Sequence, residues 1–358
     1  MQQQSTARLT IDLEALAANY LQLCAVAAPA AVAAVVKANA YGLGMLPVAA
    51  RLRAAGCRSF FVATPAEGLE LRAADGTARI FVLAGTSAAA VPAVLGARLV
   101  PVLNTLAEVR DWTAQAGDAP AALHLDTGMM RLGLDERDVE RLSAAPALLA
   151  ALRLELVMTH LACADDPEHP LNAAQVVLFD ALRARLPAAP RSIGNSAGTL
   201  LGPAYRGDLV RPGIALYGGR PFARGPNPMR PVARLEARVL QIHEIHRDST
   251  VGYGATHVAR PPARLATVGA GYADGYPRAL SGRGYALAAG HAVPVVGRVS
   301  MDLLTLDVSE LPAGALAVGD WVDLVGGGVP LEEVARLAGT ANYEVLTRFT
   351  ARALRRYL

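Results

Sequence analysis

The chain has 358 residues, which is long for one hydrophobic core and predicts two domains. It is 53% hydrophobic and 18% charged, a composition that excludes a mainly disordered protein. The net charge is only +3, and the lysines and arginines are scattered rather than clustered, which argues against a nucleic-acid-binding surface.

The N-terminal residues and the cysteines predict a cytoplasmic protein that does not bind a membrane. Residues 1–6 contain no apolar core of a secretion signal, and the longest apolar stretch, residues 25–36, is interrupted by Pro29 and too short to span a bilayer. None of the three cysteines has the spacing of a metal site or a disulfide framework. The cluster at residues 243–246 lacks the HExxH spacing and an apparent third ligand, so we expect no metal site.

Up to about residue 220, apolar runs alternate with segments of helical spacing. Asp12 is the expected N-cap of the first helix, and later helical segments include Pro47–Ala55, Leu106–Ala116 and Asn172–Leu186. Eight strands are predicted, at residues 31–36, 60–63, 80–83, 99–103, 122–125, 154–158, 192–193 and 209–210. Eight βα units are typical of a (β/α)8 TIM barrel, which we assign to residues 12–228. The weak seventh and eighth strands leave a doubly wound sheet open.

Polar residues directly follow most of these strands. They are Lys37, Thr64, Asn104, Asp126 with Arg131, His160, Asn195 with Ser196, and Arg211. Active sites of such barrels form at the C-terminal ends of several strands at once. The placement of these residues therefore supports the barrel and predicts a site at its C-terminal mouth.

Residues 229–358 predict a C-terminal, mainly β domain. After residue 228 the apolar segments are short and β-branched, with Gly and Pro between them. Regular helices are expected only at Leu331–Leu337 and in the tail from Tyr343 to Leu358. Leu9-Thr10-Ile11, within residues 1–11, could add a strand to this domain.

Lys37 ends an apolar run of six residues that is typical of a strand buried on both faces. A lysine at the mouth of such a strand is partly desolvated, which lowers its pKa and prepares its amine for Schiff-base chemistry. The alternative is a lysine that simply leaves the core and reaches water. These residues alone favour the alternative.

Two further strand ends carry candidate residues. Arg131 presents a fork of donors suited to a carboxylate or a phenolate, but it could equally pair with Asp126 or Asp135. His160 ends a strand, where a histidine is more often a buried core residue than a catalyst.

Three glycine-containing segments add candidate ligands. Ser196 lies between a strand and a helix, where its hydroxyl could donate to a phosphate. Gly213 and Ile214 could offer backbone N–H groups to a phosphate, and Arg211 could face a pyridine nitrogen. Tyr272 lies among glycines in the β domain, either as a site residue or as an ordinary turn aromatic.

Taken in order, these segments resemble alanine racemases across nearly the whole chain. The matching segments are VVKANAYG (35–42), DTGMMRLG (126–133), the strand end at His160, IGNSAG (193–198), RPGIALYG (211–218), GYADGY (271–276) and GRVSMD (297–302). The resemblance implies a barrel that binds pyridoxal 5′-phosphate (PLP), followed by a β domain, in a head-to-tail homodimer with a shared active site. It further implies an isomerase that supplies D-alanine for cell-wall peptidoglycan.

The same resemblance implies catalytic roles. Lys37 holds PLP and acts as one base, and Tyr272 of the partner subunit acts as the second on the opposite face. His160 and Arg211 form a hydrogen-bonded chain behind the tyrosine, with Arg211 facing the ring nitrogen of PLP. Because arginine stays charged, it does not readily protonate that nitrogen, which discourages transamination.

The resemblance also implies binding roles. Arg131 and the Met301 backbone N–H hold the carboxylate of alanine. The phosphate of PLP contacts four residues, Tyr41, Ser196, Gly213 and Ile214.

Three positions depart from the family pattern. Seven residues before Arg131, many members have a lysine modified to a carbamate, whereas this chain has His124, which cannot form that anionic bridge. Ala351 stands where some members have a phosphate-binding tyrosine, and Ser300 stands where cysteine is frequent. These departures bear on rate and substrate preference more than on the reaction itself.

Other activities stay open at this level. One is a racemase of other or several amino acids, since the sequence does not define the size of the pocket. Another is a non-catalytic PLP-binding barrel protein, against which the β domain with Tyr272 argues. A decarboxylase of related fold is the third, and it would release carbon dioxide.

Overall fold

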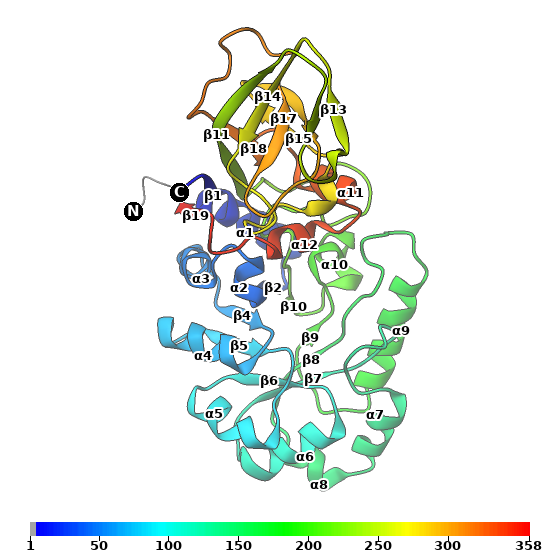
Figure 1. Cartoon of the computed structure of the whole chain (residues 1–358). Helices are drawn as coiled ribbons and strands as arrows, with labels where there is room; N and C mark the ends of the chain where they lie inside the picture. The colour runs from blue at the N-terminus through cyan, green and yellow to red at the C-terminus, as the bar shows by residue number, and fades with distance from the viewer. Residues whose placement is uncertain (1–4) are drawn as a thin grey trace.

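The computed structural model describes residues 5–358, and it consists of a parallel α/β barrel with a mainly β domain above its mouth (Figure 1). The first described strand and the last strand both belong to the β domain, so the described part of the chain begins and ends beside the junction of the two parts. No helix within residues 5–358 has both the length and the apolar character needed to cross a bilayer.

The barrel is built from parallel strands in chain order. Seven of them form one sheet, β3 (Ala34–Val35), β4 (Ser59–Val62), β5 (Arg79–Val82), β6 (Val100–Leu103), β7 (Ala121–His124), β8 (Leu154–Met158) and β9 (Arg191–Ser192). β2 (Ala31–Val32) directly precedes β3 and pairs with β10 (Leu209–Val210). The Val35 N–H donates to Pro212 O at 3.1 Å and the Arg211 N–H to Gly194 O at 2.7 Å, which closes the ring. The predicted TIM barrel is confirmed.

Helices connect these strands on the outside of the barrel (Figure 1). They are α1 (Leu13–Ala27), α3 (Met45–Ala54), α4 (Pro65–Ala74), α5 (Val91–Gly96), α6 (Leu106–Gln115), α7 (Glu136–Ser143), α8 (Pro146–Ala150), α9 (Leu171–Arg183) and α10 (Ser196–Leu201). The short element α2 (Lys37–Tyr41) lies instead at the barrel mouth, and its dihedral angles are not those of a regular helix. Short 3-10 turns lie at Ala88–Ala90 and Pro203–Tyr205. The expected cap of the first helix is confirmed, since Asp12 Oδ1 accepts from the Ala15 N–H at 2.7 Å.

The β domain contains an eight-stranded sheet. In spatial order its strands are β14 (Ala263–Val268), β17 (Leu304–Asp307), β16 (His291–Val296), β15 (Tyr285–Ala288), β18 (Trp321–Val325), β11 (Ala233–Ile245), β1 (Ala7–Ile11) and β19 (Leu354–Tyr357). β14 also pairs with β11, so this part of the sheet curls into a barrel. The hairpin β12 (Ser249–Val251) and β13 (His257–Ala259), 3-10 turns at Tyr253–Ala255 and Arg278–Leu280, and helices α11 (Leu331–Ala338) and α12 (Asn342–Thr347) complete the domain.

The C-terminal tail differs from the predicted helix. The helix α12 ends at Thr347, and the last residues form β19, parallel to β1. The reason is tertiary: β1 pairs with β11 on one side and offers its free backbone groups to the tail on the other. The division of the chain at residue 228 stays a prediction, and of residues 1–11 only residues 5–11 lie in the described part.

Candidate active site

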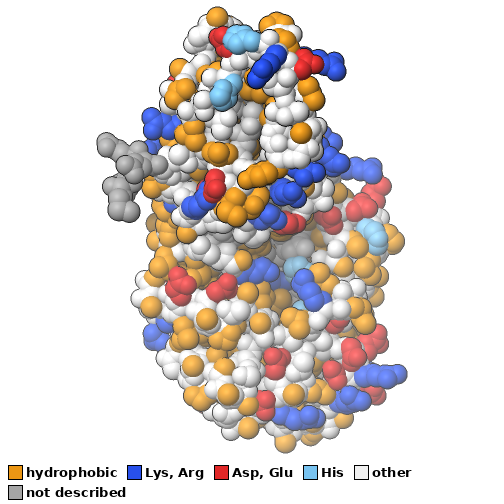
Figure 2. Space-filling view, in the orientation of Figure 1, with side chains coloured by type: hydrophobic (Ala, Val, Ile, Leu, Met, Phe, Trp, Pro, Cys, Tyr) orange, Lys and Arg blue, Asp and Glu red, His pale blue; other side chains and the backbone are white. Residues whose placement is uncertain are grey.

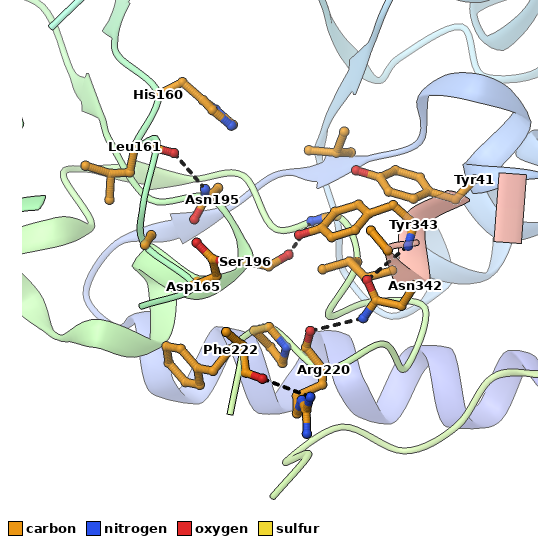
Figure 3. Close-up of a pocket in the computed structure, with 18 of the residues that line it drawn as sticks. Tyr41, His160, Leu161, Asp165, Asn195, Ser196, Arg220, Phe222, Asn342 and Tyr343 are labelled. Atoms are coloured by element: carbon orange, nitrogen blue, oxygen red, sulfur yellow. Dashed lines mark hydrogen bonds between the residues drawn. The ribbon is translucent and has the colours of Figure 1, made fainter. Parts of the chain in front are cut away.

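A cavity of about 750 Å³ opens at the C-terminal mouth of the barrel, below the β domain. In the space-filling view it is a hollow between the two parts, with Lys, Arg and His side chains near it (Figure 2). Predicted site residues from several strand ends line it together, namely Lys37, Tyr41, Arg131, His160, Ser196, Arg211, Gly213 and Ile214. Helices α11 and α12 of the β domain supply the facing wall, which includes Tyr343 (Figure 3).

The segment after Lys37 has an unusual backbone. Residues 38–41 all have left-handed dihedral angles, with φ between 53° and 55°, and none of them is glycine. Each such residue costs roughly 1–2 kcal/mol relative to the right-handed region. Hydrogen bonds hold this turn, because the Ala40 N–H donates to Val36 O at 2.9 Å and the Ala38 N–H donates to Glu67 Oε1 at 2.8 Å. These hydrogen bonds stabilise the strained backbone, which leads the chain sharply from the strand into the cavity wall and fixes the direction of Lys37.

The amine of Lys37 is poised to be neutral more readily than that of an exposed lysine. Burial lowers the pKa of Lys37, the positive charge of Arg131 lowers it further, and the carboxylate of Glu67 partly opposes both. A neutral amine is a nucleophile and a base. The lysine is therefore suited to capture an aldehyde and to move a proton.

Tyr41, Ser196 and Gly213 form a cradle at one side of the cavity. Figure 3 shows the side chains of Tyr41 and Ser196. A Cβ atom on Gly213 would lie 2.2 Å from Tyr41 Oη, so only glycine lets the Tyr41 hydroxyl approach this closely. Ser196 Oγ accepts from the Gly213 N–H at 2.9 Å and from the Ala215 N–H at 3.2 Å, which leaves its own hydrogen to donate. Two hydroxyl donors at the same wall of the cavity fit the phosphate of PLP.

The Gly213 N–H donates to Ser196 Oγ, so its predicted contact with a phosphate stays a prediction. The missing side chain of Gly213 leaves room for the Tyr41 hydroxyl. Tyr41 is held in place by Tyr217, whose ring centroid lies 4.7 Å away and whose buried hydroxyl donates to Val35 O at 2.8 Å.

Arg211 is buried and fixed below the cavity. Its Nη2 donates to Thr159 O at 2.6 Å and its Nη1 to Ser192 Oγ. Burial lowers the pKa of Arg211 to about 9, which still leaves the guanidinium charged at neutral pH. Among residues 5–358 no hydrogen bond joins it to the ring of His160, so the expected chain between the two side chains stays a prediction.

His160 lies on the opposite side of the cavity from the aromatic pair Tyr41 and Tyr343 (Figure 3). Burial and the charges of Arg211 and Arg131 hold its pKa well below the ordinary value for histidine. The imidazole is therefore neutral at physiological pH and can both donate and accept a hydrogen bond.

Arg131 lies on the segment that follows β7 and is exposed at the cavity. Asp126 does not neutralise it, because Asp126 Oδ1 accepts from the backbone N–H groups of residues 128–130. Asp135 is likewise used, as the N-cap of α7. The alternative in which Arg131 pairs with one of these carboxylates is thus absent from the described structure, and the guanidinium can receive a carboxylate of a ligand.

His124 is buried at the end of β7 with one defined proton position. Its Nδ1 lies 2.9 Å from Asn104 Oδ1. The Asn104 amide nitrogen already donates to Leu83 O and Val102 O, so Oδ1 accepts and His124 donates from Nδ1. Burial, with the charge of Arg211, lowers the pKa of His124 to about 4. The residue is a neutral histidine, and no anionic bridge to Arg131 forms from it.

Tyr272 and Met301 do not line this cavity. They lie together on the β domain, where the Tyr272 N–H donates to Ser300 O at 3.1 Å and the Ala273 N–H donates to Met301 O at 3.0 Å. Met301 is half exposed. Tyr272, which the resemblance assigns to a partner subunit, and Met301 therefore share one surface, separate from the mouth of their own barrel.

Several residues of the site had no individual sequence-based assignment. The sequence pattern indicates that Glu67 is the fourth residue of a capping box that starts at Thr64. The same pattern does not indicate that Glu67 also accepts a hydrogen bond from the turn after Lys37. Tyr217 and Tyr343 approach Tyr41 only through the fold, because they lie 176 and 302 residues away in the sequence, and no local pattern indicates either contact.

Comparisons with known proteins agree along the whole chain. The family model "Alanine racemase, N-terminal domain" matches residues 11–221, and "Alanine racemase, C-terminal domain" matches residues 232–357. The alanine racemase of Rhodospirillum rubrum is 51% identical over 99% of this chain and 96% of its own length. Catabolic and biosynthetic alanine racemases of Agrobacterium fabrum are 47% and 46% identical, each over 99% of this chain and over 92% and 95% of their own lengths.

Solved structures give the same result. The alanine racemase of Bartonella henselae, with covalently bound pyridoxal phosphate, is 40% identical with a TM-score of 0.95, over 99% of this chain and 100% of that one. The biosynthetic alanine racemase of Pseudomonas aeruginosa is 38% identical with a TM-score of 0.92, over 99% of both chains.

Proposed function

The chain belongs to the family of alanine racemases, and from that premise we propose how its own residues interconvert L- and D-alanine with PLP. The observation that supports the proposal most strongly is the gathering of Lys37, Arg131, His160 and Arg211 around one cavity with a phosphate cradle. A cavity of this kind, with a lysine of lowered pKa, is what covalent capture of PLP requires.

PLP is held by four contacts in this proposal. Lys37 Nζ would condense with its aldehyde with loss of water, and would be free again as a base once the amino group of the substrate replaces it. Tyr41 and Ser196 would donate to its phosphate from the cradle, and the charged Arg211 would lie on the side of its ring nitrogen. When bound, PLP withdraws electrons from the Cα–H bond of an amino acid joined to it and so makes that proton acidic.

Two groups on opposite faces then handle the Cα proton. Lys37 Nζ takes it from, or returns it to, one face, and the phenol oxygen of Tyr272 of the partner subunit does the same on the other face. His160 supports the phenol from within the cavity. Racemisation follows because a proton removed on one face is replaced on the other.

The substrate is oriented by its carboxylate. Arg131 receives it from the barrel, and the backbone N–H of Met301 of the partner subunit donates to it from the β domain. The homodimer is part of the proposal. The shared surface of Tyr272 and Met301, away from their own barrel mouth, supports it.

A direct assay tests the activity. We expect purified protein with PLP to convert L-alanine to D-alanine and the reverse. Borohydride reduction is expected to leave the cofactor attached irreversibly to Lys37. Failure to racemise alanine while PLP is bound would favour the non-catalytic alternative, and release of carbon dioxide would favour a decarboxylase. Faster turnover of serine, lysine or arginine than of alanine would favour a racemase of other amino acids.

The biological role is also a proposal. We infer that the enzyme supplies D-alanine for peptidoglycan in the cytoplasm, a location supported by three cysteines that form no disulfide with one another. Deletion of the gene is expected to make growth depend on added D-alanine. Growth without D-alanine, together with loss of growth on alanine as a carbon source, would instead assign a catabolic role.

A further inference from the structure

Arg352 lies between the two turns that present Tyr272 and Met301. Its Nε and Nη2 donate to the two carboxylate oxygens of Asp274, each at 2.8 Å, and its Nη1 donates to Asp302 Oδ1. Asp274 belongs to the same turn as Tyr272, and Asp302 directly follows Met301. One guanidinium therefore joins both turns.

Asp274 needs this partner because it is buried. Only 3% of its side chain is exposed, and its Oδ2 also accepts from the Gly271 N–H at 2.9 Å, which closes the turn of residues 271–276. A buried carboxylate is stable only with a counterion and with donors for its oxygens. Arg352 is the counterion, so its pairing and the shape of the Tyr272 turn depend on each other.

The two turns are also in direct contact. The Tyr272 N–H donates to Ser300 O and the Ala273 N–H to Met301 O, at 3.1 and 3.0 Å. A Cβ atom on Gly271 would lie 2.4 Å from the carbonyl oxygens of both Ser300 and Met301, so the backbones pack without room for a side chain. A displacement of one turn must therefore move the other.

We propose that Arg352 is a positioning residue of the racemase reaction, which fixes the Tyr272 phenol and the Met301 N–H relative to each other. This inference rests on the proposed function, in which these two groups serve one active site of the dimer. Proton transfer and carboxylate binding both require a fixed geometry, and a misplacement of about 1 Å can cost on the order of 100-fold in rate. Arg352 acts through the two turns and touches no reacting atom.

The test compares four variants of the PLP-loaded enzyme. Arg352→Met removes the charge, and Arg352→Lys keeps it but reaches one carboxylate at a time. Asp302→Asn weakens the contact of Arg352 with the exposed carboxylate of Asp302 and leaves the buried pair of Arg352 and Asp274 intact. We therefore expect this variant to fold even if Arg352→Met does not. Arg348→Met is the matched control, because Arg348 lies in the same C-terminal segment and pairs with Glu344.

The first measurement is amide hydrogen exchange by mass spectrometry. We expect Arg352→Met and Asp302→Asn to speed exchange in residues 271–276 and 300–303 and to leave residues 37–44 of the barrel unchanged. The second is kinetics. We expect Arg352→Met to lower kcat on the order of 10- to 100-fold and to raise KM for alanine, with Arg352→Lys intermediate and Arg348→Met within about twofold of the parent.

Solvent deuterium separates positioning from a general loss of structure. In Arg352→Met, uptake at Cα of the enantiomer served by Tyr272 is expected to fall, while uptake at the enantiomer served by Lys37 persists. Equal loss for both enantiomers, or unchanged exchange and kcat in both Arg352→Met and Asp302→Asn, would overturn the inference. Tyr272→Phe is the reference: if it racemises normally, the base assignment fails, whereas the exchange measurements still decide the role of Arg352.

Discussion

At the scale of single residues, the site depends on ionisable side chains whose pKa values are lowered by burial and on the glycine at position 213. Lys37 is desolvated beside a cation, Arg211 stays charged although it is buried, and His124 is neutral with its proton on Nδ1. Gly213 has no side chain and so leaves room for the Tyr41 hydroxyl. Each of these properties can be changed by one substitution.

Capture of PLP by Lys37 is predicted to respond in opposite directions to two nearby charges. The reaction needs the neutral amine, so its rate rises as pH rises through the pKa of Lys37. Arg131→Gln removes a cation that lowers this pKa and should move the profile to higher pH. Glu67→Gln removes a carboxylate that raises it and should move the profile to lower pH. Stopped-flow absorbance of apoprotein mixed with PLP measures both, and shifts in the same direction would contradict the assignment.

Closing the cradle is predicted to weaken PLP binding. In Gly213→Ala the new methyl group would meet Tyr41 Oη at 2.2 Å, so the tyrosine must move away from the phosphate. We expect the affinity for PLP to fall at least tenfold, which is about 1.4 kcal/mol, as measured by equilibrium titration of the apoprotein. Gly96→Ala is the control, because a Cβ there meets no atom within 4 Å. If Gly213→Ala binds PLP with unchanged affinity, the phosphate does not bind next to Tyr41 and Gly213.

At the scale of elements, the decisive piece is the left-handed turn between β3 and α3. It places Lys37 at the barrel mouth, and its cost in conformational free energy comes from the left-handed dihedral angles of residues 38–41. Its hydrogen bond to Glu67 of α4 and the bond from the Met45 N–H to Asn39 Oδ1 at 2.8 Å compensate part of that cost. The strand, the turn and two helices therefore act as one unit.

A β-branched residue in this turn is predicted to destabilise the protein. Ala38 has φ 53° and ψ 48°, a conformation that valine adopts poorly. We expect Ala38→Val to lower the free energy of unfolding by about 1–2 kcal/mol and to slow PLP capture. The exposed Ala66→Val in α4 should cost at most about 0.7 kcal/mol. Chemical denaturation measures both, and equal losses would mean that the turn bears no strain.

At the scale of the whole molecule, the proposed function divides the site between two parts of the chain, each incomplete alone. The barrel mouth holds Lys37, and the β domain holds Tyr272 and Met301 on a surface that its own cavity does not reach. A head-to-tail dimer would join the halves twice. Activity should then depend on association.

Complementation tests this arrangement. Lys37→Ala and Tyr272→Phe are each expected to be nearly inactive alone. When they are mixed, unfolded and refolded together, half of the dimers are mixed, and each of these has one site with both residues intact. We therefore expect about one quarter of the parental activity to return. If the refolded mixture shows no more activity than the two variants alone, each chain uses its own Lys37 and Tyr272.

The sequence by itself determined the barrel strands, the first helix cap and the residues that gather at the mouth. These follow from local patterns, because strand burial and helix spacing are written in neighbouring residues. The resemblance to alanine racemases also pointed to Tyr272 and Met301 as site residues, which stays a prediction, and it did not place them relative to the cavity.

Only the tertiary structure decided the remaining features. The tail forms β19 instead of a helix because β1 offers it free backbone groups. Gly213 provides space because Tyr41 packs over it, and His124 has a defined proton because Asn104 faces it. Arg352 meets Asp274 and Asp302 across 78 and 50 residues. Such contacts join distant parts of the chain, and no local periodicity encodes them.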